Sequence, residues 1–337
     1  MSCYHPLHGF KIGLTEKGKA LYQIESGKTE WIHPKQGNKI VVDKIIKDYI
    51  EIPCGQCIGC RLDYSRQWAD RCMLEAKEHE HNYMITLTYN DEHLTYKNKI
   101  NEDGEILYKT PSLKPDDLSI FMKNLRRYYK YHYNIDKIKF YGCGEYGSQT
   151  ERPHFHIIVY DCPIYDLKCF FKNAVNEWIY LSDTIEKIWA KGQITVTELT
   201  WNSAAYVARY VTKKIKGQNA TKYYDEKNQE PEFVRMSRNP GIGKNYYDNH
   251  KEEIYNTDEI IILKKGLPTK IKPAKYYDKL YDIENPEHME EIKKQRLEIA
   301  KNTMLNQLQK TDKTKEEYLL TKEYEKLQQI RSLIRTN

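Results

Sequence analysis

The amino-acid sequence predicts an α+β fold, in which an antiparallel β-sheet has helices packed on one side and is followed by a charged helical tail. Short segments rich in β-branched and aromatic residues are typical of strands, and longer segments with apolar residues three and four apart are typical of helices. The two kinds follow one another in mixed order rather than in a strict strand–helix–strand repeat, which favours antiparallel pairing. Residues 287–337 contain neither Pro nor Gly and are rich in charged residues and Gln, which indicates the tail.

The strands and helices of the central region are predicted from these patterns. We expect strands at residues 83–89, 137–142, 154–160 and 194–199. We expect helices at residues 62–78, 116–131 and 202–216, and one or two helices within residues 167–189. The helix at 116–131 has the clearest pattern, because Leu118, Phe121, Met122 and Leu125 fall on one face.

The ends of the chain are less informative than its centre. Residues 1–50 show no clear pattern, and the tail predicts two amphipathic helices, near residues 292–308 and 316–334. A solvated helical tail is the simpler interpretation, and a partner-binding coil is the alternative. The predicted domains are therefore an N-terminal segment (1–50), a main domain that opens with a cysteine-rich segment (51–272) and a charged helical tail (273–337).

The charge of the chain permits an anionic partner without requiring one. The 337 residues include 54 Lys and Arg against 48 Asp and Glu, a net charge of +6. The bases are concentrated between Tyr206 and Lys222, where no acidic residue occurs. This segment is the natural candidate for contact with a polyanion.

Hydropathy and the first residues bear on the compartment of the protein. The mean hydropathy is −0.82 and no long apolar run occurs, which excludes a membrane-spanning helix. The first residues lack the basic and apolar regions of a signal peptide. We therefore expect the eight cysteines to serve as thiols or metal ligands rather than as disulfides.

Two histidines in a predicted strand are the first half of a candidate metal site. His154 and His156 flank Phe155, and because side chains alternate along a strand, both imidazoles point to one face. Histidines on a solvent-facing strand also serve as ordinary hydrogen-bonding residues. Glu145, nine residues upstream, can reach the same face and adds a carboxylate. Two imidazoles and one carboxylate leave positions open for water and phosphate, and suit Mg²⁺ or Mn²⁺, with the histidines favouring Mn²⁺.

Two tyrosines in the last predicted helix of the main domain are candidate nucleophiles. Tyr206 and Tyr210 lie one helical turn apart, next to alanines, and Lys213 falls close to the same face. A phenol has a pKa near about 10 and needs nearby positive charge to attack at neutral pH. The chain has 29 tyrosines, and the same spacing at Tyr129/Tyr133 and Tyr277/Tyr281 is better explained by core packing.

Two further motifs suggest binding sites. Residues 142–147 match G-x-G-x-x-G, but they run into another predicted strand rather than a helix, which excludes a dinucleotide-binding site. Cys54, Cys57, Cys60 and Cys72 have the wrong spacing for an iron–sulfur cluster of the ferredoxin type. They either hold a structural Zn²⁺ or are reduced free cysteines in a tight turn.

Taken in order, five motifs resemble the replication initiators of gokushovirus-type microviruses, which are small single-stranded DNA phages. These belong to the HUH endonucleases, named for two histidines around a hydrophobic residue. The resemblance covers roughly residues 54–247 and rests on these segments: Pro53–Arg61, Thr86–Tyr89, Arg152–His156, Tyr206–Val211 and Ser237–Gly243. The family pattern has Lys between its tyrosines, where this chain has Arg209, which supplies charge but does not easily donate a proton.

The resemblance implies a fold, an activity and partners. The fold would be a five-stranded antiparallel sheet carrying His154 and His156, with two tyrosines on a nearby helix. The activity would be metal-dependent nicking and joining of DNA in rolling-circle replication, through a 5′-phosphotyrosine intermediate that leaves a 3′-OH primer. The partners would be viral origin DNA, as duplex and single strand, and the host polymerase and helicase, in the bacterial cytoplasm.

Two alternatives to this function remain at the level of the sequence. The first is a relaxase or transposase of a mobile element with the same HUH chemistry, although no third histidine of the relaxase type is apparent. The second is a non-catalytic zinc-dependent DNA-binding protein, in which the cysteines bind the metal and the tyrosines only pack.

Overall fold

The computed structural model describes residues 3–15, 20–32, 45–147, 149–173, 176–213, 219–264 and 266–333. The chain divides into two compact units, Met1–Asp63 with Lys293–Asn337 and Tyr64–Ile292. The predicted domain boundaries after residues 50 and 272 do not coincide with these limits.

The smaller unit contains strands from the N-terminal segment, where the sequence shows no clear pattern. Its three-stranded sheet has the order β2 (Ala20–Glu25), β1 (Leu7–Leu14), β5 (Tyr49–Ile52), and β3 (Trp31–Ile32) pairs with β4 (Ile45–Ile46). The same unit includes α9 (Lys315–Leu333) and most of α8 (Pro286–Leu308), close to the two helices predicted for the tail. Ion pairs connect the two ends of the chain, since His5 Nε2 lies 2.6 Å from Glu323 Oε2 and Lys315 pairs with Glu51.

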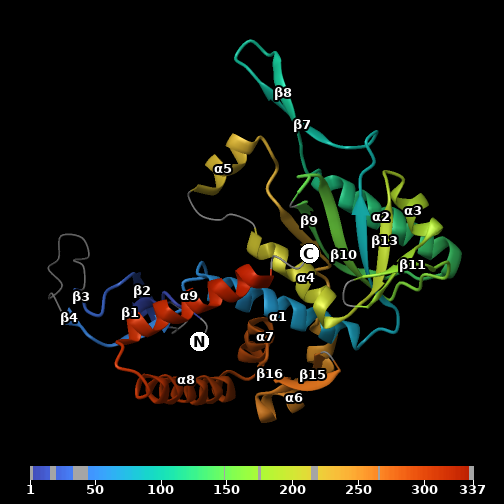
Figure 1. The fold of residues 1–337 in the computed structure, drawn as a ribbon. Helices are drawn as coiled ribbons and strands as arrows, with labels where there is room; N and C mark the ends of the chain where they lie inside the picture. Colours follow the sequence, from blue (N-terminus) through green and yellow to red (C-terminus); the bar gives the residue numbers. More distant parts are fainter. Residues whose placement is uncertain are drawn as a thin grey trace. The chain divides into compact units, whose positions relative to one another are not determined.

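The larger unit is built around an antiparallel sheet, as predicted. Among the described residues this sheet has seven strands rather than five, in the order β11-β12-β13-β6-β10-β9-β14 (Figure 1). Every paired neighbour is antiparallel. The four predicted strands are its contiguous centre: β13 (Ile194–Glu198), β6 (Asn82–Thr88), β10 (Pro153–Tyr160) and β9 (Lys139–Tyr146).

Helices cover both faces of this sheet, so the expectation of helices on one side was wrong. On one face, apolar residues of α2 (Pro115–Tyr133) and α3 (Asp183–Trp189) pack on inward-facing residues of the central strands, among them Phe155 and Ile157. On the other face, α1 (Ile58–Ala76) and α4 (Trp201–Lys213) pack on Tyr141, Cys143 and Ile158. Strand alternation produces this division, because residues with odd and even numbers in β10 point to opposite faces.

Residues 167–189 are only partly helical, which corrects the predicted helices. They form the edge hairpin of β11 (Lys168–Lys172) and β12 (Trp178–Leu181), followed by α3. Ser182 caps α3, since its hydroxyl accepts from the Ile185 amide at 3.1 Å. The exposed strands carry Phe170, Phe171 and Trp178, residue types that favour strands as much as an amphipathic helix.

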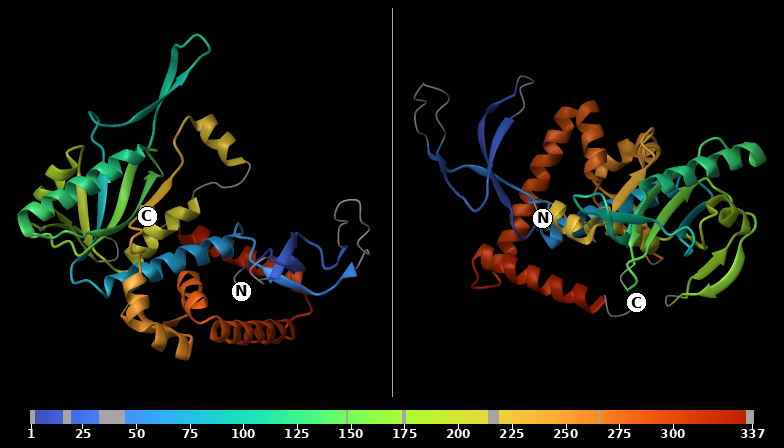
Figure 2. Two further views of the ribbon diagram at one scale, coloured as in Figure 1. Left: turned by 180° about the vertical axis from the view of Figure 1, so that it is seen from behind. Right: turned by 90° about the horizontal axis from the view of Figure 1, so that it is seen from above.

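The remaining elements complete the larger unit. A hairpin of β7 (Tyr96–Ile100) and β8 (Ile106–Pro111) projects from the sheet, where the sequence predicts a loop (Figure 2). The others are α5 (Asn219–Lys227), β14 (Phe233–Met236), α6 (Lys244–Thr257), β15 (Ile260–Lys264), β16 (Leu267–Ile271) and α7 (Lys275–Glu284). The predicted solvated tail includes α7, but Tyr277 and Tyr281 of this helix are buried in a core with α6.

A buried carboxylate ties α1 to the sheet and to the start of α6. Glu75 Oε1 accepts from Lys139 Nζ at 2.6 Å and from His79 Nε2 at 2.9 Å, and Oε2 accepts from the Gly243 amide at 2.6 Å. Burial by itself would raise the pKa of the Glu75 carboxyl, but these hydrogen bonds lower it on balance. A fully buried charge is tolerated here because several donors surround it.

We predict that Glu75→Ala lowers the free energy of unfolding by about 3–5 kcal/mol, because the Lys139 ammonium loses its buried partner. Urea denaturation at neutral pH measures the loss, with Glu80→Ala, an exposed glutamate just beyond the end of α1, as the control. Because the folded-state pKa is depressed, the contribution of Glu75 is present above its ordinary value of 4.5 and fades as the pH falls through the folded-state value. A difference between the two proteins that grows in acid would contradict this explanation.

Candidate active site

The pairing of β9 with β10 places the three predicted metal ligands on one face of the sheet. His154 lies directly opposite Glu145 in the antiparallel register, and His156 lies opposite Cys143. Residues opposite each other, and residues two apart in one strand, point to the same side. The face is the one against which α4 packs.

The donor atoms of these side chains converge on one point. Glu145 Oε1 lies 2.8 Å from His154 Nε2 and 3.0 Å from His156 Nε2. Metal–ligand bonds of about 2.1 Å at right angles put neighbouring donor atoms about 3 Å apart. The two imidazoles and the carboxylate therefore fit a single divalent ion with hard and borderline ligands, such as Mg²⁺ or Mn²⁺.

Oxygen atoms behind the imidazoles hold the rings in place. His154 Nδ1 lies 3.1 Å from the Arg152 carbonyl oxygen, which can only accept, so Nδ1 carries the proton and Nε2 is the lone-pair donor. His156 Nδ1 lies 2.9 Å from the Thr86 hydroxyl on β6. Such partners orient metal-binding histidines and fix their tautomers.

Burial and charge suit the carboxylate to this role. The Glu145 side chain is only 3% exposed, and the pair His154 and His156 are 17% and 7% exposed. Burial alone would raise the pKa of the Glu145 carboxyl, but hydrogen bonds from the two imidazoles bring it below its usual value. The carboxylate form that a metal requires is therefore the one that the site stabilises.

A pocket of about 300 Å³ opens beside the two histidines. Threonine side chains and the guanidinium of Arg152 belong to its lining. Arg152 donates to the Tyr89 carbonyl oxygen at 3.0 Å and pairs with Asp91 at 2.7 Å. The pocket gives the donor cluster access to solvent on a side lined by polar groups and a cation.

Helix α4 brings one of the predicted nucleophiles to the cluster. The Tyr206 ring meets the His156 ring edge to face, with centroids 5.0 Å apart. The alanines of α4, Ala204, Ala205 and Ala208, are buried against the sheet. Their small side chains let the helix lie close to β9 and β10, rather than leaving the tyrosine edges open as the sequence suggests.

The other two catalytic candidates belong to the last part of α4. The backbone at residues 210 and 213 is helical, so positions 206, 210 and 213 fall on one side of the helix. The side chains of Tyr210 and Lys213 lie outside the described ones. The alternative tyrosine pairs lie elsewhere, since Tyr129, Tyr277 and Tyr281 are buried in hydrophobic cores, as predicted.

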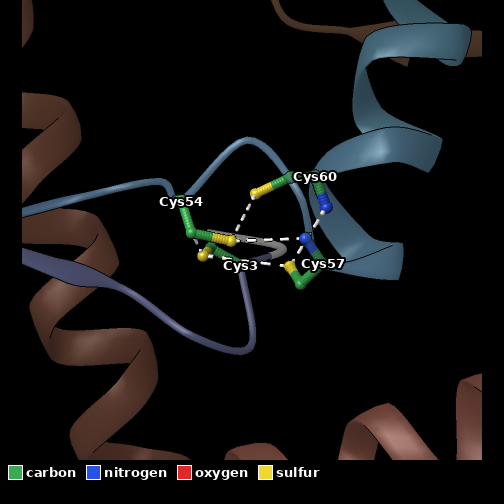
Figure 3. A group of neighbouring side chains, drawn as sticks. All are labelled: Cys3, Cys54, Cys57 and Cys60. Atoms are coloured by element: carbon green, nitrogen blue, oxygen red, sulfur yellow. Dashed lines mark hydrogen bonds between the residues drawn. The ribbon is translucent and has the colours of Figure 1, made fainter. Parts of the chain in front are cut away.

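The structure brings together three of the four predicted zinc ligands and adds a different fourth cysteine. Cys54, Cys57 and Cys60 meet Cys3 at the start of α1 (Figure 3). Cys72 is fully buried in the core between α1 and the sheet, where burial raises its pKa to about 12. Its thiol packs there among apolar side chains, outside the group of sulfur atoms that converge, so Cys72 is not placed to complete the set.

Cys3 was missed because nothing in the sequence links residue 3 to residues 54–60. The link is a long-range one, through the pairing of β1 with β5, and the first 50 residues show no strand pattern. The count of eight cysteines was the single available signal. The positions of Thr86 and Arg152 behind the imidazoles likewise depend on strand register, which the sequence alone leaves open.

Comparisons with known proteins agree on one family. The family of the replication-associated protein ORF2 matches residues 82–215, which include the histidines, the glutamate and the tyrosines of α4. Replication-associated protein ORF2 of Spiroplasma virus 4 is 34% identical over 326 residues, covering 95% of this chain and 93% of the relative. Replication-associated protein VP4 of Bdellovibrio phage phiMH2K is 30% identical over 240 residues, covering 70% and 69%.

A third relative extends the agreement. Replication-associated protein ORF4 of Chlamydia phage 1 is 28% identical over 263 residues, covering 76% of this chain and 61% of the relative. No solved structure matches the chain. Among the described residues, no helix is both long enough and apolar enough to cross a membrane.

Proposed function

The chain belongs to the replication-associated proteins of microviruses, and from this premise we propose that it is a metal-dependent endodeoxyribonuclease and strand transferase that nicks and rejoins viral origin DNA. The proposal rests on one observation above all. Tyr206 packs edge to face on His156, which shares the Glu145 carboxylate with His154. A phenol beside a cluster of metal-binding donors is the arrangement that HUH chemistry requires.

The divalent ion would be held by His154, His156 and Glu145. Bound there, it would act as a Lewis acid on the scissile phosphate, neutralising charge that develops on the phosphate oxygens. The chain itself contributes the orientation of both imidazoles, through the Arg152 carbonyl and the Thr86 hydroxyl. The pocket beside the histidines gives a single strand room to bring its phosphate to the same point.

The chemical step is a transesterification. The tyrosine loses its proton, and its oxygen forms a bond to the phosphorus while the bond from phosphorus to the 3′ oxygen breaks. The 3′ oxygen takes up a proton and leaves as a 3′-OH, and the 5′ end stays attached to the tyrosine as a phosphodiester. The energy of the broken bond is kept in the new one, so rejoining needs no nucleotide cofactor.

Two tyrosines on one helix explain how such a reaction can both start and end replication. The released 3′-OH primes a host polymerase, which copies the circle while a host helicase separates the strands. When the origin is regenerated, the second tyrosine cleaves it, and the new 3′-OH attacks the first phosphotyrosine to close a circle. Lys213, on the same side of α4, would supply positive charge that favours the phenolate.

The alternative functions have less support. The relatives are named replication-associated proteins of phages, which favours a replication initiator over a relaxase or transposase. A zinc protein that only binds DNA would have no need for three donors that converge beside a tyrosine. We place the activity in the host bacterial cytoplasm, where phage DNA is replicated.

We predict that His154→Ala and His156→Ala each reduce cleavage of an origin single strand about a thousandfold. A Lewis acid supplies several kcal/mol to the transition state, and about 1.4 kcal/mol corresponds to a factor of ten. Cleavage of a labelled oligonucleotide with Mn²⁺ or Mg²⁺ measures the rate. Glu145→Gln should require more metal for half-maximal activity.

His132→Ala is the matched control, because this exposed histidine on α2 lies apart from the donor cluster. It should cleave at the rate of the unmodified protein. Binding of the origin strand, followed by fluorescence anisotropy, should survive in all variants. Cleavage by the unmodified protein in the presence of EDTA would refute the role of the metal.

We predict that Tyr206→Phe and Tyr210→Phe each still nick an oligonucleotide, because the remaining phenol can attack. The double variant should form no covalent adduct with the DNA. Each single variant should fail to close circles, since closure needs one tyrosine that is linked to DNA and one that is not. Gel separation of the adduct and peptide mass spectrometry identify the linked residue.

Tyr131→Phe is the control for the loss of a hydroxyl, because Tyr131 on α2 is 84% exposed. It should behave like the unmodified protein in all three assays. An adduct on Tyr129, Tyr133, Tyr277 or Tyr281, or an adduct formed by the double variant, would show that another tyrosine is the nucleophile.

A further inference from the structure

A second group of metal-ligand side chains lies in the smaller unit, outside the proposed nicking site. We propose that Cys3, Cys54, Cys57 and Cys60 bind one structural Zn²⁺ ion, which fastens the N-terminal strand to the start of α1 (Figure 3). The function proposed above makes no use of these thiols, so this site stands on its own observations.

The spacing of the sulfur atoms fits a single ion. All four Sγ atoms lie within 4.8 Å of one another, with 4.0 Å between Cys54 and Cys60 and 3.9 Å between Cys57 and Cys3. Four sulfurs at about 2.3 Å from one zinc ion form a tetrahedron with edges of about 3.8 Å. An iron–sulfur cluster places several metal atoms between its thiolates and needs them further apart.

The backbone around the cluster supplies donors to the sulfur atoms. The amides of Cys54 and Cys57 donate to Cys3 Sγ and Cys54 Sγ, each at 3.3 Å. The amides of Tyr4 and Cys60 donate to Cys57 Sγ at 3.4 and 3.5 Å. Hydrogen bonds of this kind, from successive amides to sulfur, lower the charge on a metal-bound thiolate.

Local structure explains why the three clustered cysteines can converge. Cys54 and Cys57 are separated by a turn in which Gly55 has a φ of +75°, a conformation that favours glycine. Cys57 directly precedes α1, whose first residue is Ile58, and Cys60 lies in its first turn. The positive end of the helix dipole therefore faces the thiolates.

The cluster connects segments that are far apart in the sequence. Cys3 precedes β1, and Cys54 follows β5, the strand with which β1 pairs. His5, two residues after Cys3, forms the ion pair with Glu323 of α9. Zinc at this point would order the N-terminal segment, and with it the contact to the C-terminal helix, because the binding energy of a structural metal is also folding energy.

A disulfide pair is the competing explanation for four neighbouring cysteines. The sulfur–sulfur distances of 3.9 and 4.0 Å are about twice the length of a disulfide bond. The thiols Cys3, Cys57 and Cys60 are buried, so the group is shielded from exchange with other proteins. The arrangement is that of a closed metal site with four protein ligands and no open position.

The test is the metal content of the full-length protein, purified without added metal and without an N-terminal tag. Elemental analysis should find about one zinc per chain, and Cys3→Ser and Cys57→Ser should each reduce it about tenfold. Cys169→Ser is the exposed control, and Cys72→Ala tests the buried cysteine outside the cluster. Both should keep the zinc of the unmodified protein.

Replacement of zinc by Co²⁺ gives a reading of the ligands that does not depend on the stability of the variants. The unmodified protein should show the intense visible absorption of tetrahedral Co²⁺ with thiolate ligands. About one iron per chain, or metal-free protein whose cluster cysteines are oxidised, would overturn the proposal. Zinc that is lost in Cys72→Ala but kept in Cys3→Ser would overturn the set of ligands. None of these readings depends on DNA cleavage.

Discussion

The antiparallel register between β9 and β10 is the constraint on which the candidate active site depends. It sets His154 opposite Glu145 and turns His156 to the same face, so that three donor atoms meet at one point. A shift of one residue would move the glutamate to the opposite face, into the core beneath α2. Buried apolar residues on both faces hold the register, among them Phe155 on one side and Ile158 on the other.

Close packing on the α4 face turns this register into a reactive arrangement. Glycine at position 144 allows close approach on the opposite face, because a Cβ there would lie 2.6 Å from the Phe233 ring. The alanines of α4 have the same effect on the side of the metal ligands, where they let the helix carry Tyr206 up to His156. The tyrosine is thus positioned by the backbone of a packed helix, and the histidines by hydrogen bonds to oxygen, which limits the freedom of both.

Sequence patterns predicted what depends on local periodicity and failed where contacts are long-range. The four central strands and the shared face of His154, His156 and Glu145 follow from side-chain alternation, and both were found close to where they were expected. The tyrosines of α4 stood out through their neighbours and the family resemblance, because tyrosine spacing recurs throughout this chain. Cys3 and the buried face of α7 could not be predicted, since their partners are distant in the sequence. The edge hairpin of β11 and β12 was mistaken for helix because aromatic residues fit either pattern.

The claim that register, metal and tyrosine form one site can be examined by crystallography. Crystals of the variant with both Tyr206 and Tyr210 changed to Phe, grown with Mn²⁺ and an uncleaved origin strand, would contain the site before reaction. Anomalous scattering at the manganese edge should give one peak bonded to His154 Nε2, His156 Nε2 and Glu145, next to a DNA phosphate that faces α4. A manganese peak away from these three side chains, or a phosphate on the far side of the sheet from α4, would contradict the mechanism.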